Sequence, residues 1–140
     1  MQKSSRMAKK HSTVTLDKAG SRARLREAHA YLSAADLFST GSAAESKVAG
    51  SNAIQAGIAA ADAICGLVLG ERSSGDDHAH AISLLKRATH PSTKAANTLA
   101  RLLTQKTPVQ YGADTISASE AANLIKWARD IVSEADTKDR

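Results

Sequence analysis

The amino-acid sequence predicts an all-α fold, a four- to five-helix up-and-down bundle. Alanine, the strongest helix former, occurs 28 times among the 140 residues, whereas only four residues are aromatic. Apolar residues recur at steps of three and four along several segments, and β-branched runs with a period of two are absent. With 42% hydrophobic residues, a chain of this length is expected to form one domain with its own core.

The two longest predicted helices occupy the first half of the chain. The first begins near Thr15 or Asp17 and runs to about residue 39, with apolar residues repeating along one stripe. The second covers residues 43–69 and is apolar nearly all round in its later part, which is typical of a central helix with neighbours on several sides. Asp62 interrupts this apolar stretch, so its carboxylate must find a partner or face solvent.

Three further helices are predicted at residues 78–90, 92–105 and 117–135. A polar loop at residues 70–77 precedes the first of them, with Ser74 and Asp76 as candidate N-caps. The turn-rich residues 107–115 are expected to form a connection without regular structure. Ser117 begins a capping-box pattern just before an apolar run, which indicates the start of the last helix.

The net charge of +5 is divided unevenly along the chain. Residues 1–26 carry a net charge of +7, and residues 27–140 carry a net charge of −2. The sequence therefore predicts a flexible basic arm at residues 1–14, followed by a single helical domain at residues 15–137. Such an arm can follow the phosphates of RNA, although a solvated tail without function explains the same residues.

Several classes of function lack their usual signals. The chain has no run of about 18 consecutive apolar residues, so no membrane span is predicted. Its single cysteine, Cys65, excludes a disulfide within the chain and favours a reducing, cytoplasmic environment. No glycine-rich phosphate loop of the Walker or Rossmann type occurs, and we expect no bound cofactor.

The candidate catalytic residues are Arg72 and His78, near the two ends of the polar segment between helices. The arginine is a permanent cation whose forked donors suit a phosphate group. A neutral histidine can take the proton of a ribose 2′-hydroxyl, and the alkoxide can then attack the adjacent phosphate while the arginine stabilises the developing charge. The pair could therefore cleave RNA without a metal. The same two residues could instead form surface salt bridges with nearby acids, which contribute little.

Ser73, Asp77 and His80 lie close to this pair in the sequence and are candidate supporting residues. A metal site formed by Asp76, His78 and His80 is a weaker alternative, because histidines two residues apart do not share one face of a helix. No other histidine or cysteine lies near them in the sequence, so we predict no metal ligands.

Residues 54–85 comprise an alanine-rich apolar helix, then Arg72, five residues, His78 and an amphipathic helix. This arrangement resembles the HEPN (higher eukaryotes and prokaryotes nucleotide-binding) superfamily. The C-terminal part is similar to the family's last helix, with a Tyr111–Gly112 turn before Ser117 and the apolar run that follows. The resemblance covers residues 20–136.

The resemblance implies a helical bundle that forms a homodimer and, in many members, a metal-independent RNase activity, including toxins of toxin–antitoxin pairs. By this similarity Arg72 is the phosphate-stabilising cation and His78 the proton-transfer residue, and the two face each other across the dimer axis. Active members usually carry Asn, Asp or His directly after the arginine, where this chain has Ser73. Other members bind nucleotides without catalysis, or pair with a nucleotidyltransferase or an antitoxin, and this alternative stays open.

Overall fold

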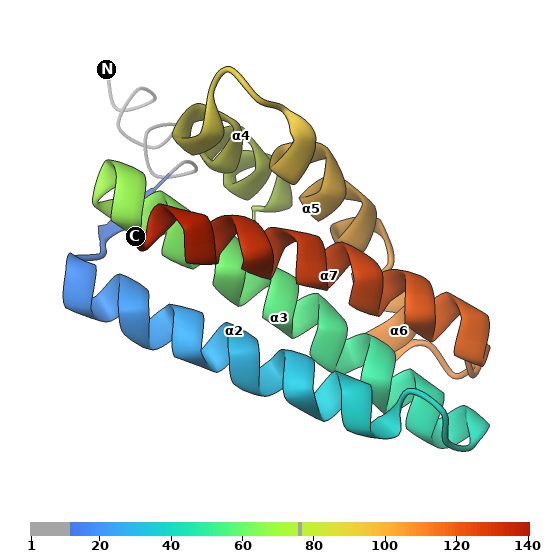
Figure 1. The fold of residues 1–140 in the computed structure, drawn as a ribbon. Coiled ribbons are helices and arrows are strands. Elements are labelled where there is room, and N and C mark those ends of the chain that lie inside the picture. Colours follow the sequence, from blue (N-terminus) through green and yellow to red (C-terminus); the bar gives the residue numbers. More distant parts are fainter. Residues whose placement is uncertain (1–11, 76) are drawn as a thin grey trace, which may run out of the picture.

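The computed structural model describes residues 12–75 and 77–140 and is an all-α helical bundle, as the sequence predicts (Figure 1). Five helices of at least 11 residues, one six-residue helix and a two-stranded sheet make up the regular structure of these residues. In chain order the elements are β1 (Thr13–Thr15), α2 (Lys18–Phe38), α3 (Ala43–Leu69), β2 (Glu71–Ser73), α4 (His78–Thr89), α5 (Lys94–Thr104), α6 (Lys106–Tyr111) and α7 (Ala118–Lys138).

Helix α3 is the centre of the fold, and its predicted bounds are confirmed. It packs along α2 and α7, while α4 and α5 form a shorter pair beside them (Figure 1). Fourteen of its 27 residues are buried, and most of these are alanine or glycine, so neighbouring helices approach closely. Among the glycines of α3, Gly66 leaves the least room, because a Cβ atom there would lie only 2.0 Å from Oγ of Ser21 on α2.

Among the described residues, α3 is the one helix that is long and apolar enough to cross a membrane, judged by length and composition alone. In the most apolar part of this helix, 61% of the residues are buried inside the bundle. Core helices of soluble proteins have the same composition, because all their faces pack against other helices. Packing within this fold therefore accounts for the apolar character of α3.

Residues 71–73 form one strand of a small antiparallel sheet, whereas the sequence predicts a polar loop over residues 70–77. Strand β1 pairs with β2 so that Val14 lies opposite Arg72, and the Leu16 amide donates to the Gly70 carbonyl at 2.9 Å. The Thr13–Thr15 segment is a β-branched run, which the sequence analysis overlooked because of its shortness. The expected boundary between arm and domain, after residue 14, falls inside this strand. Residues 1–11 of the expected arm lie outside the described residues.

Helix α6 begins one residue before the connection predicted at residues 107–115 and occupies its first part, so that prediction is wrong in part. Pro108 is the third residue of α6, and proline is tolerated in the first turn of a helix. The predicted capping box of α7 is confirmed: the Glu120 amide donates to Ser117 Oγ at 3.0 Å, and the Ser117 amide donates to the Glu120 carboxylate at 2.8 Å.

Candidate functional site

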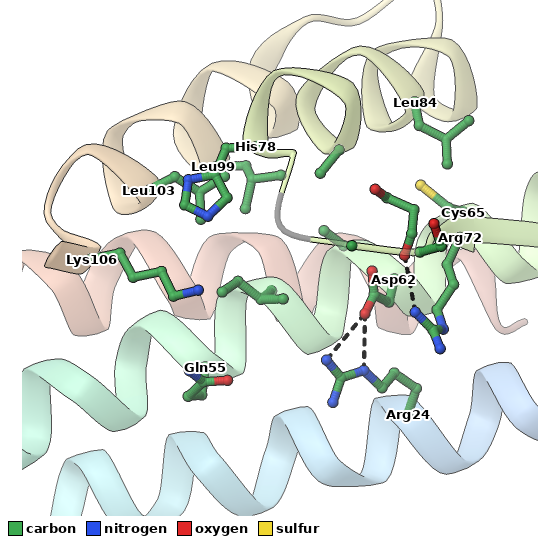
Figure 2. A pocket seen from close by; sticks show the side chains of 16 residues that line it. Arg24, Gln55, Asp62, Cys65, Arg72, His78, Leu84, Leu99, Leu103 and Lys106 are labelled. Carbon is green, nitrogen blue, oxygen red and sulfur yellow. Dashed lines mark hydrogen bonds and ion pairs between the residues drawn. The ribbon is translucent and has the colours of Figure 1, made fainter. Parts of the chain in front are cut away.

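A cavity of about 230 Å³ opens between α3 and the elements that follow it (Figure 2). Side chains from α2, α3, β2, α4, α5 and the start of α6 line it. The charged and polar lining includes Arg24, Gln55, Asp62, Arg72, His78 and Lys106. The two candidate catalytic residues therefore line one cavity, together with two further cations that the sequence analysis did not select.

Arg72 is positioned by the small sheet. Gly70 ends α3 in a left-handed conformation, with a φ of 76°, and turns the chain into β2. Pairing with β1 then holds the backbone of Arg72 extended. Its Nη1 donates a hydrogen bond of 2.9 Å to the carbonyl oxygen of Ser73, and its charge lies close enough to Asp62 to act on that carboxylate.

His78 is positioned as the first residue of α4. Asp77 is the N-cap of this helix, and its Oδ1 accepts a 3.0 Å hydrogen bond from the amide of His80. This replaces the predicted caps Ser74 and Asp76, the second of which lies outside the described residues. Asp77 therefore holds the turn of backbone that carries His78.

Arg72 and His78 approach the cavity from opposite sides. Figure 2 shows the His78 imidazole on the side of Lys106 and Leu103, and the Arg72 guanidinium on the side of Asp62 and Arg24. A ligand placed between the two sides would meet both catalytic candidates. Arg72 and His78 thus line the same cavity, although the figure shows no direct contact between them.

The three supporting candidates have different positions. Ser73 is buried and lines the cavity, and within the described residues its Oγ has no hydrogen-bond partner. Asp77 acts on the backbone as a cap, and His80 does not belong to the cavity lining. No group of three potential metal ligands occurs in residues 12–75 and 77–140, and the Asp76 of the weaker metal alternative falls outside them.

Arg24 and Asp62 form an ion pair at the cavity wall. The Arg24 Nη2 and Nε atoms lie 3.0 and 3.1 Å from Asp62 Oδ2, and Arg24 Nη1 lies 2.8 Å from Glu27 Oε1. The expectation that Asp62 finds a partner is confirmed. Arg24 could not be recognised as this partner from the sequence, where it counts toward the N-terminal positive charge, although it belongs to α2 and not to the arm.

Burial decides the protonation behaviour of two groups in the lining. It raises the pKa of Asp62, although the positive charges of Arg24 and Arg72 oppose the shift. Burial also raises the pKa of Cys65 to about 12, and the charges of Asp62 and Glu71 add to this. The Cys65 side chain therefore stays a neutral thiol at physiological pH and is not an activated nucleophile.

For the pKa of Arg24, the nearby carboxylates outweigh burial. Burial lowers the pKa of its guanidinium, but the hydrogen bond with Glu27 and the charge of Asp62 raise it above the ordinary value. Arg24 is therefore a fixed cation at the cavity wall. The pKa values of both partners of the Arg24–Asp62 pair are raised. The raised pKa of Asp62 reflects its deeper position, because its side chain is 15% exposed, whereas the Arg24 side chain is 26% exposed.

The fold and the cavity together define a helical-bundle protein with a predominantly cationic pocket, half lined by apolar side chains. No protein-family model matches the chain, and no curated protein shows significant sequence similarity to it.

Proposed function

We propose that this protein is an HEPN-like, metal-independent endoribonuclease that acts in this cavity. One observation carries the proposal: Arg72 and His78, from β2 and from the first turn of α4, line a single cavity from opposite sides. Arg24 and Lys106 add positive charge to the cavity lining, and this favours the binding of a phosphodiester.

The proposed reaction uses the ribose 2′-hydroxyl as the nucleophile. His78 accepts the 2′-hydroxyl proton, and the 2′-oxygen attacks the adjacent phosphorus atom. The bond from phosphorus to the 5′-oxygen of the next nucleotide breaks, the leaving oxygen takes up a proton from water, and a 2′,3′-cyclic phosphate remains. Arg72 stabilises the negative charge that builds on the phosphate oxygens, and a charge-assisted bond there replaces its weaker bond to the Ser73 carbonyl.

Cleavage of RNA by the purified full-length chain in the presence of EDTA tests this proposal. His78→Ala is expected to abolish the cleavage, because it removes the proton acceptor. His29→Asn is the matched control: this histidine lies on α2, pairs with Asp136 at 2.9 Å and is not part of the cavity lining. Equal cleavage by the wild type and His78→Ala would overturn the assignment of the activity to this site.

A homodimer with a shared active-site cleft is part of the proposal, as is a cytoplasmic location. Val14 and Val68 are 40% and 45% exposed on β1 and at the end of α3, so a dimer interface beside Arg72 would cover apolar surface. Light scattering on the purified chain is expected to give twice the monomer mass. Mixed Arg72→Ala and His78→Ala chains should regain part of the cleavage if one cleft draws residues from both chains.

The second candidate is a non-catalytic module that binds a nucleotide and partners a nucleotidyltransferase or an antitoxin. The observation that favours it is that the Arg72 guanidinium is bonded to its own strand and lies across the cavity from the His78 ring. Nucleotide binding that persists in His78→Ala, without cleavage by the wild type, would establish this candidate in place of the RNase.

A further inference from the structure

We infer that the cavity binds one nucleoside unit of single-stranded RNA together with the phosphates on both of its sides. The inference deepens the proposed function and rests on its assignment of this cavity as the substrate site. It follows from how charge is distributed in the lining. Figure 2 shows His78 and Lys106 at one side of the cavity and Arg24 and Arg72 at the other.

The first phosphate site is formed by Arg24 and Arg72, whose positive charges both act on Asp62 (Figure 2). Arg24 donates to Asp62 through two contacts of 3.0 and 3.1 Å, and its Nη1 donates to Glu27, while Arg72 Nη1 donates to the Ser73 carbonyl oxygen. A phosphate binds here by replacing the exposed Glu27 carboxylate on Arg24 and the Ser73 carbonyl oxygen on Arg72. Guanidinium groups are planar donors of the kind that bind phosphate oxygens in pairs.

The second phosphate site is formed by Lys106 with His78. Lys106 is the first residue of α6, is half-buried, and extends along the cavity on the same side as His78 (Figure 2). A lysine ammonium is a compact charge with three donors, suited to a phosphate that needs no fixed orientation. In this site Lys106 is a positioning residue, because it holds the phosphate beside the proton acceptor His78.

The rest of the cavity lining fits a nucleoside. Ile58, Leu99 and Leu103 supply apolar contacts on which a base can lie, and Gln55 offers an amide that can both donate and accept a hydrogen bond. Ser73 Oγ is buried, lines the cavity and has no partner within the described residues, so a ligand hydroxyl or phosphate oxygen would satisfy it.

The charges favour a ligand with two phosphates. The lining holds three permanent cations, Arg24, Arg72 and Lys106, and one carboxylate, Asp62, while Glu27 contacts Arg24 from outside the lining at 2.8 Å. These groups sum to a net charge of +1, or +2 once a phosphate replaces Glu27 on Arg24. A nucleoside unit inside an RNA strand has one negative charge on each flanking phosphodiester. A ligand with a single phosphate would reach only one of the two sites.

Binding of thymidine 3′,5′-bisphosphate to the full chain, measured by calorimetry, tests the inference. The compound lacks the 2′-hydroxyl and is not cleaved by the proposed reaction. We expect it to bind at least about tenfold more tightly than thymidine 5′-monophosphate and 3′-monophosphate, which is about 1.4 kcal/mol. Inorganic pyrophosphate carries two phosphates without a nucleoside between them and is expected to bind no more tightly than the monophosphates.

Variants assign the two sites. Lys106→Met and Arg24→Met are each expected to reduce the advantage of the bisphosphate to less than about twofold, whereas the exposed controls Lys126→Met and Arg101→Met leave it unchanged. Because Arg24→Met leaves Asp62 buried without its partner, the double variant Arg24→Met/Asp62→Asn repeats the test in a protein in which only the exposed Glu27 loses its contact with Arg24.

The outcomes separate this inference from the proposed function. Equal affinity for the bisphosphate and the monophosphates, or tighter binding of pyrophosphate, would overturn the two-site inference even if the protein cleaves RNA. A bisphosphate preference that depends on Arg24 and Lys106 in a protein that does not cleave RNA would support the inference and overturn the RNase.

Discussion

The polar groups at the two ends of the bundle have different roles. At the end where α3 and α7 begin, Ser42 with Glu45 and Ser117 with Glu120 form two reciprocal capping boxes, with hydrogen bonds of 2.8–3.2 Å. At the other end, the polar groups of Arg24, Asp62, Arg72 and Ser73 line a cavity.

The capped end contributes to stability, whereas the cavity end suits the binding of a ligand. In the capping boxes the side chains satisfy the backbone amides at the start of a helix, so they contribute to folding and leave little free capacity for a ligand. In the cavity, burial raises the pKa of Asp62, and Ser73 Oγ is buried without a partner among the described residues. Arrangements of this kind cost stability and are typical of sites that bind a ligand.

The largest expected effect is on the free energy of unfolding, and one substitution at each end of the bundle tests it. Leu124→Ala, in the core near the capped end, removes a side chain that is 3% exposed and is expected to lower the free energy of unfolding by about 2–5 kcal/mol. Arg72→Ala is expected to lower it by less than about 1.5 kcal/mol, because it loses a single hydrogen bond to a backbone carbonyl. Urea denaturation of both variants measures these changes.

RNA cleavage by the same two variants should show the reverse order. Arg72→Ala is expected to reduce the rate by about 100- to 1000-fold, because it removes the donor that stabilises the transition-state charge. Leu124→Ala, assayed where it is fully folded, should cleave at close to the wild-type rate. A variant at the capped end that loses cleavage while folded would contradict the division between the two ends.

A smaller effect is expected from helix caps, and it sharpens the same comparison. Ser117→Ala and Asp77→Ala each remove one side-chain cap, from α7 and α4, and each should cost about 0.5–2 kcal/mol. Only Asp77→Ala should also reduce RNA cleavage, because the Asp77 cap orders the first turn of the helix that carries His78.

Thermal denaturation and cleavage assays on the two cap variants provide the comparison. If Ser117→Ala reduced cleavage as much as Asp77→Ala at equal stability, the loss would come from general loosening of the bundle. The position of His78 on α4 would then carry no special role.

The sequence predicts the capped end better than the cavity end, and the reason is physical. A capping box and a helical apolar stripe are local patterns, so the bounds of α3 and the start of α7 can be derived from residues close in the chain. The Arg72–His78 pair is also local in sequence. Its placement in one cavity depends on β1, and the Thr13–Thr15 run that forms β1 is too short to distinguish from a tail.

The remaining cavity residues could not be predicted, because their proximity arises from helix packing. Asp62 could be recognised as a carboxylate that needs a partner, but nothing in the local pattern identifies Arg24, 38 residues earlier, as that partner. Lys106 lies between the helix predicted to end at residue 105 and the connection predicted at residues 107–115, and its approach to the cavity depends on the unexpected helix α6.

The smallest expected effect concerns Asp62 and the pH dependence of stability. Burial raises its pKa in the folded state, so the protonated form contributes stability at low pH that is lost as pH rises through the folded-state pKa. Asp62→Asn does not titrate, and Arg24 keeps its contact with Glu27 at 2.8 Å. The melting temperature of Asp62→Asn relative to the wild type should therefore increase from acid to neutral pH, by no more than a few degrees.

Circular dichroism melting curves between the acid range and neutral pH measure this difference. Asp139→Asn is a suitable control, because this carboxylate pairs with Arg22 at the surface, away from the cavity. A relative melting temperature of Asp62→Asn that falls as pH rises would mean that the attraction of Arg24 and Arg72 outweighs the cost of burial. The Arg24–Asp62 pair would then stabilise the fold, and the cavity end would resemble the capped end instead of contrasting with it.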